Sequence, residues 1–313
     1  MSRDAEMAAT TRRGLWLALG SVMLMAAWYP TMKLVMGRIS PIQAASIEAI
    51  GLTATSALWG RLRGQRQTAP PQRGWVAFAS LNTIALVLLY LSLQQLSPII
   101  VSLTGRLYVV VCAVLAVAVL RERIGMRDWT LILISSAATV AFLHGQVERA
   151  SVLGIVAATA YVVCFAIANL VAKRFGSGVA PATTLLWSRG LAALTLPLLG
   201  LMLEGQSFLQ VDPSAAAWVL GSSITTMFGG LMLYYRALGM APFALVNVLR
   251  ALGPLFVFVY SMPFASTPLT WGQCLSGIIC IASVALLSSS RPRTGDRDHT
   301  HVAPTTTQTS PRV

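Results

Sequence analysis

Charged residues are scarce in this sequence. They make up only 11% of its 313 residues, whereas soluble domains average about 25%. Hydrophobic residues make up 56% of the chain. Such a composition excludes an ordinary soluble domain and predicts an integral membrane protein.

Acidic residues are scarcer than basic ones. The chain holds 10 Asp and Glu against 23 Lys and Arg, which gives a formal net charge of +13. In a soluble protein this excess would suggest a nucleic-acid partner, but here most of the basic residues lie between apolar runs. That pattern is typical of cytoplasmic loops in membrane proteins. We therefore expect a lipid bilayer, and no nucleic acid, as the surroundings of this chain.

Residue patterns that carry catalysis or bind metals are missing as well. The 4 cysteines all lie inside apolar runs and form no CxxC pair. The sequence contains no HExxH, Walker loop or GxSxG motif, and no paired carboxylates within an apolar run. We therefore predict no enzyme activity, no metal or other cofactor, and no direct use of ATP.

Long apolar runs are what the sequence does contain. Runs of about 20 residues are long enough to cross a bilayer as helices. Short connections between them leave no room for a soluble domain, and the polar tail at 290–313 is expected to be disordered and cytoplasmic. The fold class predicted is all-α integral membrane, with ten transmembrane helices, here called spans 1 to 10: 15–36, 41–61, 74–96, 98–120, 129–146, 152–172, 181–203, 215–238, 242–265 and 271–288.

Basic residues are distributed unevenly among the connections. Those after spans 2, 4 and 6 are rich in Lys and Arg, as are both termini, whereas those after spans 3, 7 and 9 contain none. Because basic loops stay in the cytoplasm, both termini are predicted to be cytoplasmic, including the segment 1–13. The predicted location is the cell membrane (cytoplasmic or inner membrane), crossed many times.

The two halves of the chain repeat each other. Segments 14–146 and 151–289 each contain five spans, and an odd number means that the second half is inverted relative to the first. Inverted repeats are a transporter architecture. The matches that carry the repeat are polar, Gly or Pro residues, separated by 140 or 144 positions: Gly14 and Gly154, Lys33 and Lys173, Pro41 and Pro181, Tyr90 and Tyr234, Pro98 and Pro242, Arg106 and Arg250.

This pattern resembles a known family. The five-plus-five arrangement, the matching segments 90–98 and 234–242, and Glu122 in the turn after span 4 resemble the drug/metabolite transporter superfamily, specifically its ten-span exporters with paired EamA domains. The turn after span 9 lacks the corresponding Glu, so the two halves are unequal. The resemblance implies a secondary transporter.

Four charged residues lie deep within the spans. Arg106 and Arg250 each follow the proline that opens their span by eight residues, about 12 Å along a helix and near the middle of the bilayer. Glu48 and Arg189 lie at a similar depth. A charge there is costly unless it faces a partner or a water-filled cavity.

Three cations and one anion at this depth leave an excess of positive charge. We predict that they bind a small anionic or zwitterionic substrate, with Glu48 pairing one arginine. Two alternatives stay open: the four charges form a closed structural network, or an arginine caps backbone carbonyls in a broken helix. The other predicted substrate-binding residues are aromatic or amide side chains within the spans: Trp28, Tyr29, Asn82, Tyr90, Trp187, Tyr234 and Asn247.

The function predicted from these features is secondary active transport. The chain is expected to export a small metabolite, such as an amino acid or related carboxylate, by alternating access. Glu48, the deep carboxylate, is the candidate for coupling to protons. One alternative is an exchanger of phosphorylated or nucleotide-linked sugars, because arginines suit phosphate. Another is a non-transporting membrane sensor or assembly protein with a sealed interior.

Overall fold

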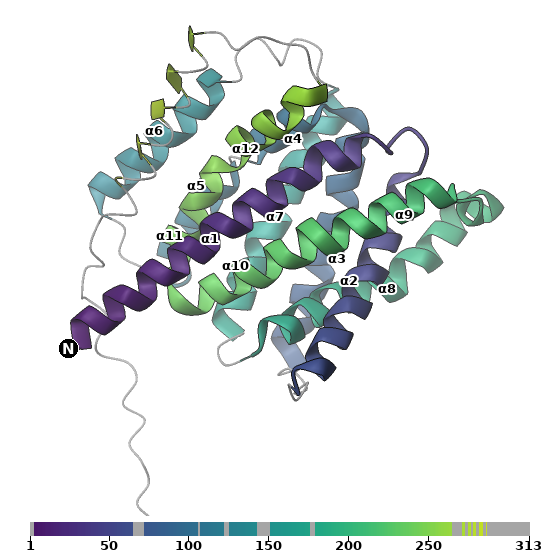
Figure 1. The fold of residues 1–313 in the computed structure, drawn as a ribbon, viewed down its shortest axis with the longest axis horizontal. Coiled ribbons are helices and arrows are strands. Elements are labelled where there is room, and N and C mark those ends of the chain that lie inside the picture. Colours follow the sequence, from purple (N-terminus) through teal and green to yellow (C-terminus); the bar gives the residue numbers. More distant parts are fainter. Residues whose placement is uncertain are drawn as a thin grey trace, which may run out of the picture.

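The computed structural model describes residues 3–64, 72–105, 107–121, 125–142, 151–175 and 179–264, and scattered positions between 271 and 286. Most of these residues form helices that pack against one another, whereas the helix Met126–Phe142 lies to one side of the others, and no β-strand occurs among the described residues (Figure 1). The all-helical prediction is confirmed for this part of the chain. Most of span 10 lies outside the described residues, so ten spans remain a prediction. Also outside them are Arg106, Glu122 and the polar tail.

Two helices of the first half begin at a proline, Pro41 and Pro98. Ser40 caps the second helix, because its hydroxyl accepts from the Gln43 backbone while the Gln43 side chain accepts from the Ser40 backbone. Pro41 then takes the first helical position, where its missing N–H costs nothing. The elements of this half are α1 (Arg3–Lys33), α2 (Pro41–Leu62), α3 (Gln72–Gln95), α4 (Pro98–Thr104), α5 (Leu107–Ala118) and α6 (Met126–Phe142).

Helices of the second half follow the same order with more interruptions. Asp212 caps α9 by accepting from the backbone and hydroxyl of Ser214, and these bonds hold the pKa of Asp212 below its usual value. The elements are α7 (Val152–Phe175), α8 (Pro181–Glu204), η1 (Gly205–Leu209), α9 (Pro213–Ser222), the π-helical turn η2 (Ser223–Phe228), α10 (Gly229–Met240), α11 (Phe243–Leu249), η3 (Arg250–Leu252), α12 (Gly253–Ser261) and η4 (Met262–Phe264).

Several helices are suited to a bilayer. Within the described residues, 5 are long and apolar enough to cross it, spanning Ala8–Lys33, Gly74–Gln95, Val152–Arg174, Pro181–Leu209 and Pro213–Met240. Large apolar side chains on their outer faces, such as Leu194 and Met202, are exposed. Lipid rather than water is the solvent that such a surface requires, so the chain is a multi-pass membrane protein.

The packing of the helices reflects the repeat. Helix α3 packs on α7, α1 packs on α10, and α2 packs on α8, and α1 and α10 run side by side in Figure 1. If the halves are exchanged, so that spans 1, 2 and 3 replace spans 6, 7 and 8, the first two contacts become each other and the third becomes itself. This exchange supports two structurally matched halves that interlock through the first three spans of each.

Two lysines at matching positions of the repeat make the same kind of hydrogen bond in the two halves. The Lys33 Nζ donates to backbone oxygens at the end of α3, including that of Leu93 at 2.8 Å. The Lys173 Nζ donates to the backbone oxygens of Leu238 and Ala241 at the end of α10. A cation satisfies the carbonyl groups that a helix leaves unpaired at its C-terminus. Each lysine therefore ties the first span of its half to the third.

Replacing either lysine with methionine is expected to lower stability by about 1 to 2 kcal/mol, because charge-assisted hydrogen bonds to carbonyls are lost. Thermal unfolding in detergent would measure the change. Arg12→Met is the matched control, since Arg12 is exposed. Lysine variants that unfold at the same temperature as the control would contradict the assignment of these bonds as structural ties.

Candidate functional site

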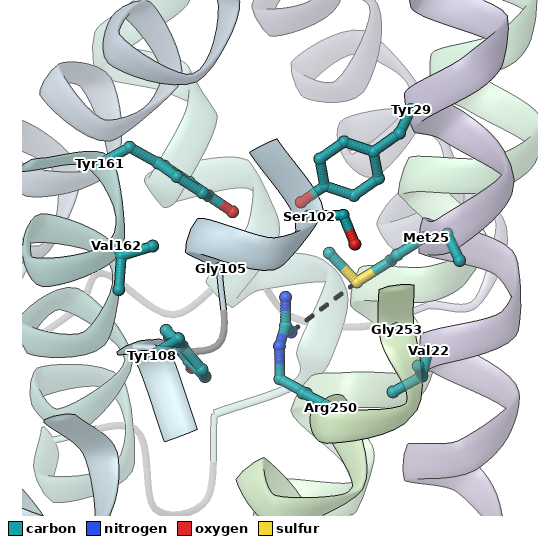
Figure 2. Close-up of a pocket in the computed structure, with 11 residues that line it drawn as sticks. Val22, Met25, Tyr29, Ser102, Gly105, Tyr108, Tyr161, Val162, Arg250 and Gly253 are labelled. Atoms are coloured by element: carbon teal, nitrogen blue, oxygen red, sulfur yellow. Dashed lines mark hydrogen bonds between the residues drawn. The ribbon is translucent and has the colours of Figure 1, made fainter. Parts of the chain in front are cut away.

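A cavity opens between the two halves at the depth predicted for the charges. Its space, including the part open to the surroundings, is about 540 Å³. Helices α1, α4 and α5 of the first half and α7, η3 and α12 of the second supply its wall (Figure 2). The lining residues are Val22, Met25, Ala26, Tyr29, Ser102, Gly105, Tyr108, Tyr161, Val162, Arg250 and Gly253.

Arg250 provides the charge of this cavity. Its guanidinium lies 4.9 Å from the ring centre of Tyr108, 5.0 Å from that of Tyr234 and 5.2 Å from that of Phe165. Figure 2 shows the guanidinium directed into the cavity, with Met25 at its side. No Asp or Glu among the described residues forms an ion pair with it. Aromatic faces attract a cation but leave its charge uncompensated, so an anion can still bind it.

The backbone changes its course where Arg250 lies. The helix of span 9 tightens into η3 at Arg250–Leu252 before α12 begins at Gly253. In span 4, α4 ends at Thr104 and α5 begins at Leu107, on either side of the position that matches Arg250. A helix interruption, which one of the open alternatives requires, is therefore present near this position in both halves. Arg106 itself lies outside the described residues, and its role stays a prediction.

Hydrogen bonds hold the aromatic rings around Arg250. The hydroxyls of Tyr108 and Tyr234 lie 2.9 Å apart, and each is within hydrogen-bond distance of the Asn247 Oδ1, at 2.9 and 2.8 Å. The Asn169 Nδ2 donates to the Tyr108 hydroxyl at 3.0 Å. Asn247 is buried behind the rings and does not line the cavity. Asn247 and Asn169 therefore position the rings that contact Arg250.

Glu48 and Arg189 form a second charged group nearby. The Glu48 carboxylate is fully buried, and its Oε2 accepts from the Tyr90 hydroxyl at 2.8 Å and from the Ser223 hydroxyl at 3.4 Å. Its Oε1 lies 3.7 Å from the Arg189 Nη2, and Arg189 is itself 6% exposed. The group joins α2 and α3 of the first half to η2 and α8 of the second. Its π-helical turn is a distortion often found at functional sites.

Trp28 and Trp187, both predicted to contact substrate, lie in different surroundings. The Trp28 ring packs edge-on against Tyr29 and Tyr90, with ring centres 5.4 and 5.3 Å away. The Trp187 side chain is 42% exposed on the outer face of α8. It precedes Arg189 by two residues, which is about 200° around a helix, so the two side chains point to opposite sides. This placement corrects the expectation that Trp187 lines the cavity.

The remaining predicted residues divide between the two charged groups. Tyr29, Tyr234 and Asn247 belong with Arg250, whereas Tyr90 and Asn82 lie toward Arg189. The sequence did not single out other contributors as binding residues: Met25, Ser102, Tyr108, Tyr161, Phe165 and Asn169. One signal for Asn169 was available, since it occupies the position that matches Tyr29 in the repeat.

Comparison with known proteins assigns the chain to a family. The model of the EamA-like transporter family matches residues 12–143 and 152–289, one match in each half. The chain belongs to the EamA-like transporter family. The resemblance expected from the sequence is thus confirmed, and this EamA protein is a membrane transporter of the drug/metabolite superfamily.

A solved structure has the same fold. A crystal structure described only as that of a protein aligns with a TM-score of 0.71 over 90% of this chain and 96% of that chain, at 17% sequence identity. At that identity the similarity shows the fold alone. None of the curated proteins compared matches this EamA protein.

Proposed function

We propose that this EamA protein is a secondary active transporter that exports a small carboxylate-bearing metabolite, an amino acid or a related carboxylate, across the cytoplasmic membrane. Both termini lie in the cytoplasm in this proposal. The observation that carries it is the Arg250 guanidinium, a cation without an acidic partner among the described residues, at the wall of a cavity between two matched halves.

The geometry around Arg250 suits a carboxylate. A planar guanidinium can donate two parallel hydrogen bonds to the two oxygens of one carboxylate, which also neutralises the charge. The rings of Tyr29, Tyr108 and Tyr161 line the same cavity and offer apolar faces to the body of a small metabolite. One guanidinium and several aromatic rings thus fit a molecule with one anionic end.

A phosphate ester fits the described residues less well. Its charge of about −1.5 to −2 near neutral pH calls for more than one cation. Arg189 is already paired with Glu48, which leaves Arg250 as the cation that the cavity wall offers within the described chain. The exchange of phosphorylated sugars is therefore an outcome of the test below and not the preferred proposal.

Alternating access is supported by the origin of the cavity wall. Residues from α1 and α7, the matching first helices of the two halves, face the same space. In transporters built from inverted repeats, the rocking of one half against the other opens such a space to each side in turn. A non-transporting sensor needs no cavity at Arg250, so the cavity argues for transport.

Thermal unfolding of the purified protein in the presence of a metabolite panel tests this proposal. The panel should contain amino acids, related carboxylates, phosphate esters and amines without a carboxylate. We expect carboxylates to raise the unfolding temperature, because a ligand that binds only the folded state stabilises it. Strongest stabilisation by phosphate esters would favour the exchanger, and stabilisation by no compound would favour the sensor.

A further inference from the structure

A second compartment adjoins the cavity at Arg250. Its space, including the part open to the surroundings, is about 350 Å³, and Arg189 and Asn82 are among the residues that line it. The two compartments share Met25, Tyr29 and Tyr161 as lining residues. Figure 2 shows the hydroxyls of Tyr29 and Tyr161 directed toward each other across the space between α1 and α7. The central space is therefore divided into two parts that meet at these tyrosines, with one arginine in each.

In the second compartment Arg189 offers hydrogen-bond donors, and its positive charge is balanced by Glu48. The Arg189 Nε is buried and has no hydrogen-bond partner among the described residues. The Arg189 charge is balanced by Glu48, yet the distance of 3.7 Å between them makes this a loose contact that leaves other guanidinium N–H groups available. A buried donor without a partner is costly, and an acceptor supplied by a ligand would remove that cost.

Positive charge at the far end of a ligand has no counterpart in the second compartment. No Asp or Glu is among the described residues that line this compartment. A ligand cation next to Arg189 would be repelled by the guanidinium. A second anionic end would bring a further negative charge to an arginine that Glu48 already neutralises. A neutral group that accepts hydrogen bonds is what remains suited to this compartment.

We propose that the substrate spans both compartments, with its carboxylate on Arg250 and a neutral hydrogen-bond acceptor, such as a carbonyl or carboxamide, on Arg189. This proposal rests on the function proposed above and narrows its substrate class. It excludes molecules whose far end is an ammonium group. Tyr29 and Tyr161 then flank the middle of the substrate at the junction of the compartments.

Three probes of similar length test which group binds in the second compartment. Each has one carboxylate, and they differ in the group at the other end. Succinamate ends in a carboxamide, pentanoate in a methyl group and 4-aminobutyrate in an ammonium group. We expect succinamate to bind about tenfold more tightly than pentanoate in calorimetry, because hydrogen bonds to a charged donor favour it. We expect 4-aminobutyrate to bind most weakly. Equal binding of succinamate and pentanoate, tightest binding of 4-aminobutyrate, or binding of none of the three would overturn the proposal.

A double variant locates the effect at Arg189. Combining Glu48→Gln with Arg189→Met removes the donor without leaving a lone buried charge. The tenfold preference for succinamate should disappear, and a preference that persists would overturn the assignment to Arg189. Arg250→Gln should weaken all three probes; if it weakens none, the proposed function fails on its own. The comparison of the three probes on the unaltered protein still tests the proposal if the double variant does not fold.

Discussion

Arg250→Gln is expected to weaken carboxylate binding by about 100-fold or more. The substitution removes a charge and the paired hydrogen bonds that a carboxylate would receive, a loss of about 3 kcal/mol or more in free energy of binding. Calorimetry on the purified protein, with the carboxylate that stabilises it best, would measure the change. A glutamine variant that binds as tightly as the parent would remove Arg250 from the site.

Loss of folding is not an alternative cause of this effect. Arg250 has no acidic partner among the described residues, so its removal leaves no buried carboxylate unpaired. Stability is therefore expected to be kept or raised. Arg250→Lys is the matched control, because it keeps the charge but lacks the planar group that faces Tyr108, Tyr234 and Phe165. It should bind about tenfold more weakly than the parent, between the parent and the glutamine variant.

Single substitutions at the Glu48 and Arg189 pair are expected to give the largest losses of stability. Either Glu48→Gln or Arg189→Met leaves the other charge buried without an opposite charge, which costs about 3 to 5 kcal/mol. The double variant should lose much less than the sum, because neither charge remains. Unfolding of the parent, both single variants and the double variant in detergent completes this cycle. Losses that simply add would show that the pair is not coupled, despite the 3.7 Å contact.

The same Glu48→Gln variant tests the proposed coupling to protons. Glu48 is held between Tyr90, Ser223 and Arg189, and glutamine cannot bind and release a proton in its place. Transport by this variant in proteoliposomes should lose its response to an imposed pH gradient. Asp212→Asn is the matched control, since it removes an acid outside the spans while an asparagine can still cap α9. An unchanged response in the Glu48 variant would make proton coupling through this residue wrong.

Helix boundaries and the repeat could be predicted because their causes are local. Pro41, Pro98 and Pro181 were expected at the starts of spans, and each takes the first position of a helix in the structure. A proline acts through its own ring and missing N–H, so its effect depends little on the rest of the fold. The matching lysines were likewise visible as a pair. Their role as ties between helices was not, because it depends on carbonyls about 60 residues away.

The direction in which side chains point was harder to predict. In a soluble helix, polar and apolar faces indicate which side is buried, but a membrane helix can be apolar on all sides. Trp187 and Arg189 illustrate this: they are two residues apart, yet one faces outward and the other lies in the interior. The rings around Arg250 come from α5, α7 and α10. Only the tertiary fold brings them together, and nothing in one span indicates its partners in another.

Residues at matching positions of the two halves have different hydrogen-bond partners. Tyr90 and Tyr234 correspond in the repeat, yet Tyr90 donates to Glu48 whereas Tyr234 bonds to Asn247 and faces Arg250. The sequence predicted symmetric positions from the repeat, and the structure gives them different partners. This asymmetry allows the two parts of the central space to recognise two different ends of one substrate.

Counterflow in proteoliposomes tests the central claim most directly. Vesicles containing the parent protein or the Arg250→Gln variant are loaded with the carboxylate that stabilises the protein best, and uptake of trace labelled carboxylate is followed. The account predicts transient accumulation with the parent protein and none with the variant. Equal accumulation by both proteins, or accumulation only of compounds without a carboxylate, would contradict it.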